Sequence, residues 1–372
     1  MLALVLCFIL IINAGSAIAQ NVEYVSSTLW TGVNDVEVVG DYAYCAFVNG
    51  LVVLDVSDSA SPTFVSRLYL QGGGNGIDID SNYAYLADGS SGLQIIDISD
   101  PAEPTRFGGY DTPGDAWGIL VSGDYAYVAD GYSGLQIIDI NNPAEPMWVG
   151  GCDTPGHALD VFVSGDYAFL ADWDSGLQII DISDPADPTR VGDYDTPNWA
   201  EGVFVSADYA FVANYRSGLQ IIDISDPAQP NWVGYYDTPG QTRGVFISGD
   251  YAYVADGSWG LQIIDISDPA QPGWVGGYDT PGYAWGAFVS SHYAYVADRY
   301  SGLQIIDISD PAQPNWAGDY DTPGWPRGVF VSGNYAYVAD VLSGLQVIDI
   351  SYPGEPTWVG GYDTPGDAWG IF

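Results

Sequence analysis

The chain has 372 residues, of which 48 are acidic and 7 are basic, so its formal net charge at pH 7 is −41. This charge repels phosphate backbones and anionic lipid surfaces, which argues against nucleic acid or a membrane surface as a partner. Aromatic residues make up 14% of the chain, which supplies ample surface for a core and excludes a disordered protein.

The first residues differ in character from everything that follows. An apolar run spans residues 2–12, and Ala-Ile-Ala at 17–19 precedes Gln20. A short apolar run followed by small residues is typical of a secretory signal peptide and its cleavage site, and it is too short to span a bilayer. We therefore predict a signal peptide at 1–19 and a secreted or cell-surface chain at 20–372, with no insertion of the mature chain into a membrane.

The rest of the chain is an internal repeat of about 42 residues. Tyr-Ala-Tyr or a close variant recurs eight times, beginning at Tyr42, Tyr83, Tyr125, Tyr167, Tyr209, Tyr251, Tyr293 and Tyr335. Each repeat contains four short segments rich in β-branched and aromatic residues, as at 202–206, 208–213, 218–225 and 231–236. A period of this length with four strands per unit predicts an all-β protein, a β-propeller of eight four-stranded blades. Seven blades are the alternative.

The predicted strands are apolar on both faces. Ile221 and Ile222 point to opposite sides of one strand, and bulky Phe211 alternates with small Ala210 in the strand before it. Blades stacked face to face around an axis provide this environment, with small residues opposite large ones. An extra copy of the fourth strand lies at 22–27 and an extra copy of the first strand at 368–372. A ring that is closed by exchanging these terminal strands is therefore a further alternative. Because the sequence stops within a strand, we also expect that the chain is truncated at its C-terminus.

The third strand of each repeat carries a family motif. It reads Leu-Val-Val-Leu-Asp at 51–55, Leu-Gln-Ile-Ile-Asp in the next six copies and Leu-Gln-Val-Ile-Asp at 345–349. The chain therefore resembles the LVIVD repeat proteins, and more distantly the YVTN-type propellers. The resemblance covers 22–372 and implies a surface-exposed propeller with a further anchoring or sorting module. It does not imply one activity, since propellers serve many functions.

Two kinds of connection differ strongly between the repeats, whereas the other two hardly vary. The variable ones join the second strand to the third, and the fourth strand to the next blade. Both open on the same side of an up-and-down blade, which we call the variable face. Trp, Tyr and Arg dominate binding hot spots, and they gather in these connections. The predicted binding residues are Trp117, Trp173, Trp199, Tyr215, Arg216, Arg243, Trp259, Trp285, Arg299, Tyr300, Trp325 and Arg327.

These residues favour a monomeric binding or scaffold protein whose ligand is a glycan or an extracellular protein. Flat aromatic rings suit sugars as well as protein side chains. Two alternatives remain open. The first is a purely structural spacer whose loops vary by neutral drift. The second is a carbohydrate-active hydrolase or lyase, for which Asp160 and Glu201 are the pair of carboxylates to test.

The sequence contains no other pattern typical of catalysis or of a bound cofactor. The two histidines, His157 and His292, are expected on opposite faces, and no Cys, His and carboxylate cluster suggests a zinc site. The Asp that follows Val-Ala and the Asp of Asp-Thr-Pro recur in nearly every repeat, which is typical of turns; Ca²⁺ binding is the alternative. Cys45 and Cys152 fall in different blades, so no disulfide is expected between them.

Overall fold

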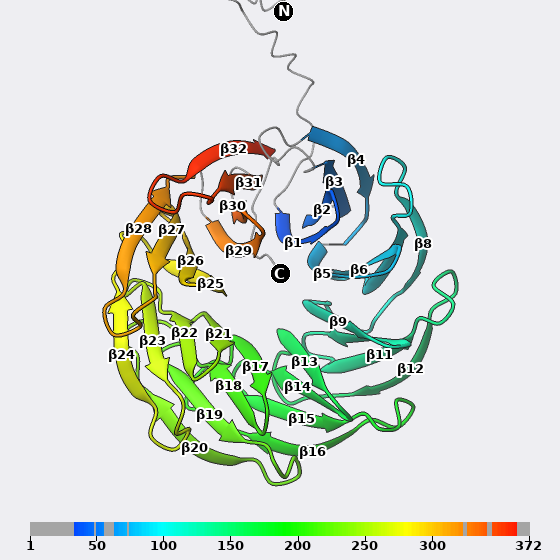
Figure 1. Cartoon of the computed structure of the whole chain (residues 1–372). Coiled ribbons are helices and arrows are strands. Elements are labelled where there is room, and N and C mark those ends of the chain that lie inside the picture. Colours follow the sequence, from blue (N-terminus) through cyan, green and yellow to red (C-terminus); the bar gives the residue numbers. More distant parts are fainter. Residues whose placement is uncertain are drawn as a thin grey trace, which may run out of the picture.

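The fold is a ring of eight blades, each a four-stranded antiparallel sheet (Figure 1). A computed structural model describes residues 33–47, 50–55, 63–72, 74–322, 326–340 and 344–362, and in these ranges no residue is helical. The predicted propeller is confirmed with eight blades, so the alternative of seven is wrong. The predicted signal peptide and both extra strand copies lie outside the described residues.

Each blade is built from four consecutive strands, and the first strand lies nearest the centre of the ring (Figure 1). The first strands are β1 (Val33–Val39), β5 (Gly74–Asp80), β9 (Gly118–Ser122), β13 (Asp160–Ser164), β17 (Gly202–Ser206), β21 (Gly244–Ser248), β25 (Ala284–Ser290) and β29 (Pro326–Ser332). The second strands are β2 (Tyr42–Phe47), β6 (Tyr83–Asp88), β10 (Tyr125–Ala129), β14 (Tyr167–Ala171), β18 (Tyr209–Ala213), β22 (Tyr251–Ala255), β26 (Tyr293–Asp298) and β30 (Tyr335–Asp340).

The outer half of each blade carries the family motif and the rim strand. The third strands are β3 (Gly50–Asp55), β7 (Leu93–Asp97), β11 (Leu135–Asp139), β15 (Leu177–Asp181), β19 (Leu219–Asp223), β23 (Leu261–Asp265), β27 (Gly302–Asp307) and β31 (Gly344–Asp349). The fourth strands are β4 (Thr63–Tyr69), β8 (Thr105–Tyr110), β12 (Met147–Cys152), β16 (Thr189–Tyr194), β20 (Asn231–Tyr236), β24 (Gly273–Tyr278), β28 (Asn315–Tyr320) and β32 (Thr357–Tyr362).

Blades are held together by apolar cores that lie between neighbouring sheets. On β18, Ala210 packs toward the preceding blade in a core that contains Phe169, whereas Phe211 packs toward the following blade beside Ala252. Ile222 and Ile221 of β19 divide between the same two cores. The alternation of large and small residues therefore lets one sheet fit against the next, as the sequence predicts.

The ring closes by contact between the last blade and the first. Cys45 and Leu54 of the first blade share a core with Tyr337 and Leu345 of the eighth. In the described part of the chain each sheet contains only consecutive strands, so packing joins these two blades. Cys45 is buried and Cys152 half-buried, and no disulfide joins them, as the sequence predicts. No helix of the described residues is long and apolar enough to cross a membrane.

The face opposite the variable one has a packing reason to be constant. The turn between the third and fourth strands, Asp-Pro-Ala-x-Pro in most copies, rests on a glycine in the fourth strand of the preceding blade. A methyl group on this glycine would lie only 2.0–2.3 Å from the carbonyl oxygen of the first proline in the turn. The glycines are Gly108, Gly150, Gly192, Gly234, Gly276 and Gly318. The constant turns therefore lock neighbouring blades together.

Candidate binding face

The two kinds of variable connection meet on the variable face. The loop between the second and third strands of one blade forms a β-bridge with the linker that leads to the next blade. Five such bridges join Gly89 to Ala116, Gly131 to Ala158, Trp173 to Ala200, Tyr215 to Thr242 and Gly257 to Ala284. The side chains of loops and linkers are therefore held close together by backbone hydrogen bonds.

The repeated acidic motif fixes the linkers in place. Asp172, which follows β14, is fully buried, and it accepts hydrogen bonds from the Thr154 hydroxyl at 2.7 Å and the Gly156 backbone N–H at 2.9 Å. Asp130 and Asp256 make the same pair of bonds in their own blades. These carboxylates therefore tie down the Asp-Thr-Pro-Gly linkers that enter the third, fourth and sixth blades, which agrees with a role in turns.

The described residues offer no metal site around these acids. No group of three or more His, Cys, Asp or Glu side chains in this part of the chain is placed to hold a metal ion. The Asp of Asp-Thr-Pro is exposed to solvent at Asp111, Asp153, Asp195, Asp237, Asp279 and Asp321, and Asp363 lies outside the described residues.

Aromatic side chains from successive connections form a continuous chain of contacts across the variable face. The His157 ring lies 5.6 Å from Trp117 and 6.4 Å from Trp173, measured between ring centroids. Trp173 lies 5.2 Å from Trp199, which stacks on Tyr215 at 4.9 Å with an interplanar angle of 26°. These separations are typical of favourable ring pairs.

An arginine extends this chain to the following blades. The Arg243 guanidinium lies 4.7 Å from the Tyr215 ring and 4.6 Å from the Trp285 ring, so it is sandwiched between them. Its Nη1 also forms an ion pair with Glu201 Oε1 at 2.9 Å. We call the set Trp117, His157, Trp173, Trp199, Tyr215, Arg243 and Trp285 the aromatic arc. Because each member contacts the next, the arc is ordered before any ligand arrives.

Two members of the arc have a strained backbone. Trp173 has φ = 48° and Tyr215 has φ = 44°, in the left-handed region, where the equivalent loops place Gly89, Gly131 and Gly257. This conformation costs a residue with a side chain about 1–2 kcal/mol. Strain of this kind gathers at functional sites, because only the surrounding structure or a function maintains it. The two aromatic side chains stand where glycine would suit the fold better.

The sequence-predicted residues occupy different parts of this face. Arg216 lies over the Tyr215 ring at 5.5 Å, and Arg299 lies 5.7 Å from Trp285 and 5.3 Å from Tyr300, so these residues flank the arc. Trp259 is half-exposed in the loop after β22. Trp325 lies outside the described residues. Arg327 lies in β29, and its side chain is not described.

Sequence reasoning did not include His157 and Tyr132 among the binding residues. The Tyr132 ring meets His157 edge-on at 4.5 Å and is the most exposed aromatic side chain near the arc. Burial lowers the pKa of His157, so its imidazole is neutral at pH 7 and packs as an aromatic ring. Within the repeat, His157 stands at the position of Trp199 and Tyr132 at the position of Tyr300, both of which were predicted. These shared repeat positions were the signal that could have identified them.

Comparison with protein families identifies the repeat. The LVIVD repeat model matches residues 32–69, 71–112, 113–154, 155–196, 199–238, 239–280, 281–322 and 323–364. The chain belongs to the LVIVD repeat family. The resemblance seen in the third strand is thereby confirmed across all eight blades. A search of curated proteins finds no match to this LVIVD propeller.

Solved structures share the propeller fold at low sequence identity. The computationally designed protein Ika8 is 8% identical, with a TM-score of 0.70 over 86% of this chain and 96% of its own. BamB from Moraxella catarrhalis is 16% identical, with a TM-score of 0.62 over 84% of this chain and 92% of its own. AztD from Citrobacter koseri is 16% identical, with a TM-score of 0.61 over 87% and 96%. Likeness at this level of identity concerns the fold alone.

The two carboxylates of the enzyme alternative both have partners within this LVIVD propeller. Asp160 accepts hydrogen bonds from the backbone N–H groups of Val161 at 2.9 Å and Val203 at 3.1 Å, and it thereby joins the inner strands β13 and β17. Burial raises the pKa of Asp160. Glu201 is held by Arg243 within the arc. The contacts made by both acids therefore join neighbouring blades.

Proposed function

We propose that this LVIVD propeller is a secreted or cell-surface binding protein that holds an extracellular protein on its aromatic arc. The observation that carries the proposal is the arc itself, a pre-ordered strip of Trp, Tyr and Arg side chains across five interblade linkers. These residue types supply most of the binding free energy in protein interfaces, and a rigid strip loses little conformational entropy on binding.

The stacking within the arc favours a protein over a glycan. A sugar ring is bound through the open face of an aromatic ring, but Trp199 has Trp173 on one neighbouring side and Tyr215 on the other. Trp199 stays 38% exposed although neighbouring rings cover part of it, whereas the Arg243 side chain is only 17% exposed. Such a surface suits the mixed apolar and polar side chains of a protein.

The experiment is a screen of the purified chain on an array of extracellular-matrix proteins and glycans. The test variant is Trp199→Ala/Trp285→Ala, and the matched control is Trp148→Ala/Trp358→Ala, which removes two tryptophans from the outer rim. We expect a protein hit that the control retains and the test variant loses by at least about 30-fold, since one hot-spot residue contributes about 2 kcal/mol or more.

The other outcomes of the screen would support a different ligand or a different function. Glycan hits lost in the arc variant would replace the protein partner with a sugar. Protein hits that both variants retain equally would contradict a role for the arc, and an array with no hits at all would favour the structural spacer.

A further inference from the structure

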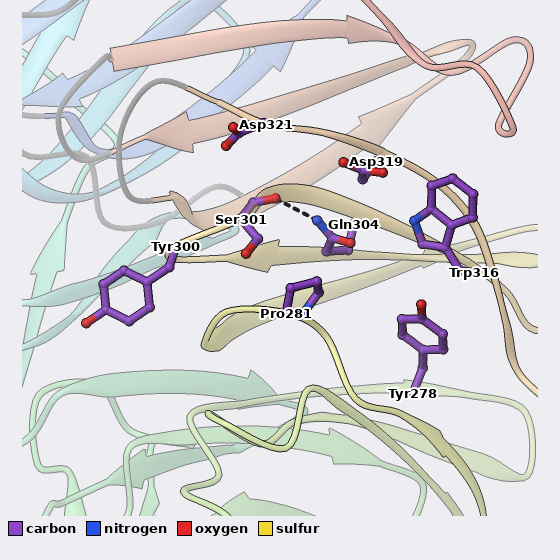
Figure 2. A pocket seen from close by; sticks show the side chains of 8 residues that line it. All are labelled: Tyr278, Pro281, Tyr300, Ser301, Gln304, Trp316, Asp319 and Asp321. Atoms are coloured by element: carbon purple, nitrogen blue, oxygen red, sulfur yellow. Dashed lines mark hydrogen bonds between the residues drawn. The ribbon is translucent and has the colours of Figure 1, made fainter.

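A groove of about 510 Å³ opens between the sixth and seventh blades toward the outer rim. Figure 2 shows Trp316 of β28 and Tyr278 of β24 at one end and Tyr300 at the other, with Gln304 between them and Asp319 and Asp321 along one wall. Trp316 exposes 49% of its surface. The groove thus combines aromatic rings with two carboxylates.

The lining of the groove carries negative charge alone. Among its eight lining residues two are acidic and none is basic, in a chain whose net charge is −41. Burial raises the pKa of Tyr278, and the negative charge of Asp319 raises it further. Arg299 contacts Tyr300, which lies at the end of the groove opposite Trp316. A positive group is therefore the ligand that this electrostatic field favours.

The fourth blade shows how a guanidinium is bound at the repeat positions that correspond to the groove. Arg190 of β16 stands at the position of Trp316, Gln178 at that of Gln304, and Asp193 at that of Asp319. Arg190 Nη1 donates a hydrogen bond to Gln178 Oε1 at 3.0 Å and lies 3.8 Å from Asp193 Oδ1. In this blade the chain's own arginine occupies the rim between glutamine and aspartate.

Only the seventh blade combines tryptophan with this aspartate. The third, fifth, sixth and eighth blades also have a rim tryptophan, but they place Gly151, Tyr235, Gly277 and Gly361 where Asp319 stands. The seventh blade therefore keeps the glutamine and the carboxylate, and it replaces the internal arginine with an aromatic ring. A cation over a Trp face and beside a carboxylate is attracted by both.

We propose that this groove binds an arginine side chain of the protein partner. The inference rests on the proposed function, because it assigns a charge to the partner that the arc holds. The groove begins at Tyr300, which is joined to the arc through Arg299 and Trp285. A partner seated on the arc can therefore extend one side chain toward the rim. Because the site is half-exposed, a single arginine is expected to bind only at millimolar concentration.

The test is a ¹⁹F NMR titration of the full chain labelled with 5-fluorotryptophan. The Trp316 resonance is assigned as the one missing from the Trp316→Phe variant. The probe is N-acetyl-Gly-Arg-Gly-amide, and its neutral control has citrulline in place of arginine. We expect the arginine peptide to shift the Trp316 resonance with millimolar half-saturation, and the citrulline peptide to leave it unchanged. Raising NaCl to 0.5 M should weaken the effect by screening.

Two isosteric variants locate the effect. Asp319→Asn should raise the half-saturation concentration about fivefold, since exposed ion pairs contribute up to about 1 kcal/mol. Asp193→Asn, at the same position in the fourth blade, should leave it unchanged. Equal shifts by both peptides, equal effects of both variants, or no shift of Trp316 would each overturn the inference.

Failure here is distinguishable from failure of the proposed function. A partner lost in the arc variant but retained in Asp319→Asn would leave the arc in place and remove only the arginine site.

Discussion

Replacing Gly276 with alanine is expected to destabilise the propeller by about 2–3 kcal/mol, whereas Gly273→Ala in the same strand is expected to be neutral or slightly stabilising. A methyl group on Gly276 would lie 2.3 Å from the Pro311 carbonyl oxygen and 2.8 Å from Pro314 Cδ of the next blade. Both atoms belong to a rigid turn, so neither can move without separating the blades. At Gly273 no atom lies within 4 Å of the added group.

The measurement is the thermal unfolding midpoint of both variants by circular dichroism. For a chain of this size, Gly276→Ala should lower the midpoint by about 3–4 °C, and Gly273→Ala should change it by less than about 1 °C. Equal midpoints for the two variants would show that the constant turns do not lock neighbouring blades. The constancy of that face would then need another cause.

Thermal stability is expected to rise as the pH falls from 7 to 5. Burial raises the pKa of Asp88, Asp172, Asp256 and Asp298 to about 6, compared with an ordinary value of 3.8. A carboxyl whose pKa is higher in the folded state binds more protons there, so the folded state gains stability as the pH falls toward 4. Each of the four contributes about 1 kcal/mol between pH 7 and 5, and the falling net charge acts in the same direction.

Other groups limit the gain in stability at low pH. Hydrogen bonds from Ser183 and Ser225 lower the pKa of Asp181 and Asp223, so their contribution to stability is lost only below about pH 4. His157, whose pKa burial lowers, opposes the trend when it becomes protonated, but it is one group against four. The midpoint should therefore be highest between about pH 4 and 5.

A quadruple variant, Asp88→Asn/Asp172→Asn/Asp256→Asn/Asp298→Asn, tests the cause of this pH dependence. The fifth blade already has Asn214 at this position, where its side chain donates to Thr196 Oγ1 at 2.7 Å, so the fold accommodates the amide. We expect the variant to fold and to show a much smaller rise in melting temperature from pH 7 to 5. A rise as large as that of the original chain would mean that these carboxyls do not cause it.

The blades could be predicted from the sequence because the same pattern of four strands recurs in each of the eight repeats. The opposed faces of Phe211 and Ala210 followed from strand alternation, and the placement of loops and linkers on one face followed from blade geometry. The stacking of Trp199 on Tyr215 did not follow, since it depends on how far neighbouring blades bring their connections together. Sequence indicated which residue types gather on the variable face, but it gave no indication of their mutual distances.

Two further features could not be predicted from the sequence, because one depends on backbone angles and the other on solvent exposure. The left-handed backbone of Trp173 and Tyr215 became visible only with its φ angles, although three glycines at equivalent positions hint at it in the sequence. The second feature is Trp316, which is half-exposed beside a groove. Periodicity places a residue on the rim, but solvent exposure there depends on the width of the gap between two blades.

The most direct test of the aromatic arc is one variant measured in two ways. Trp173→Gly/Tyr215→Gly removes two stacked rings and also relieves two strained backbones, so the effects on folding nearly cancel. We expect a melting temperature within about 3 °C of the original and binding to the captured partner that is at least about tenfold weaker. A large loss of stability with unchanged binding would contradict the account, because the arc would then serve the fold.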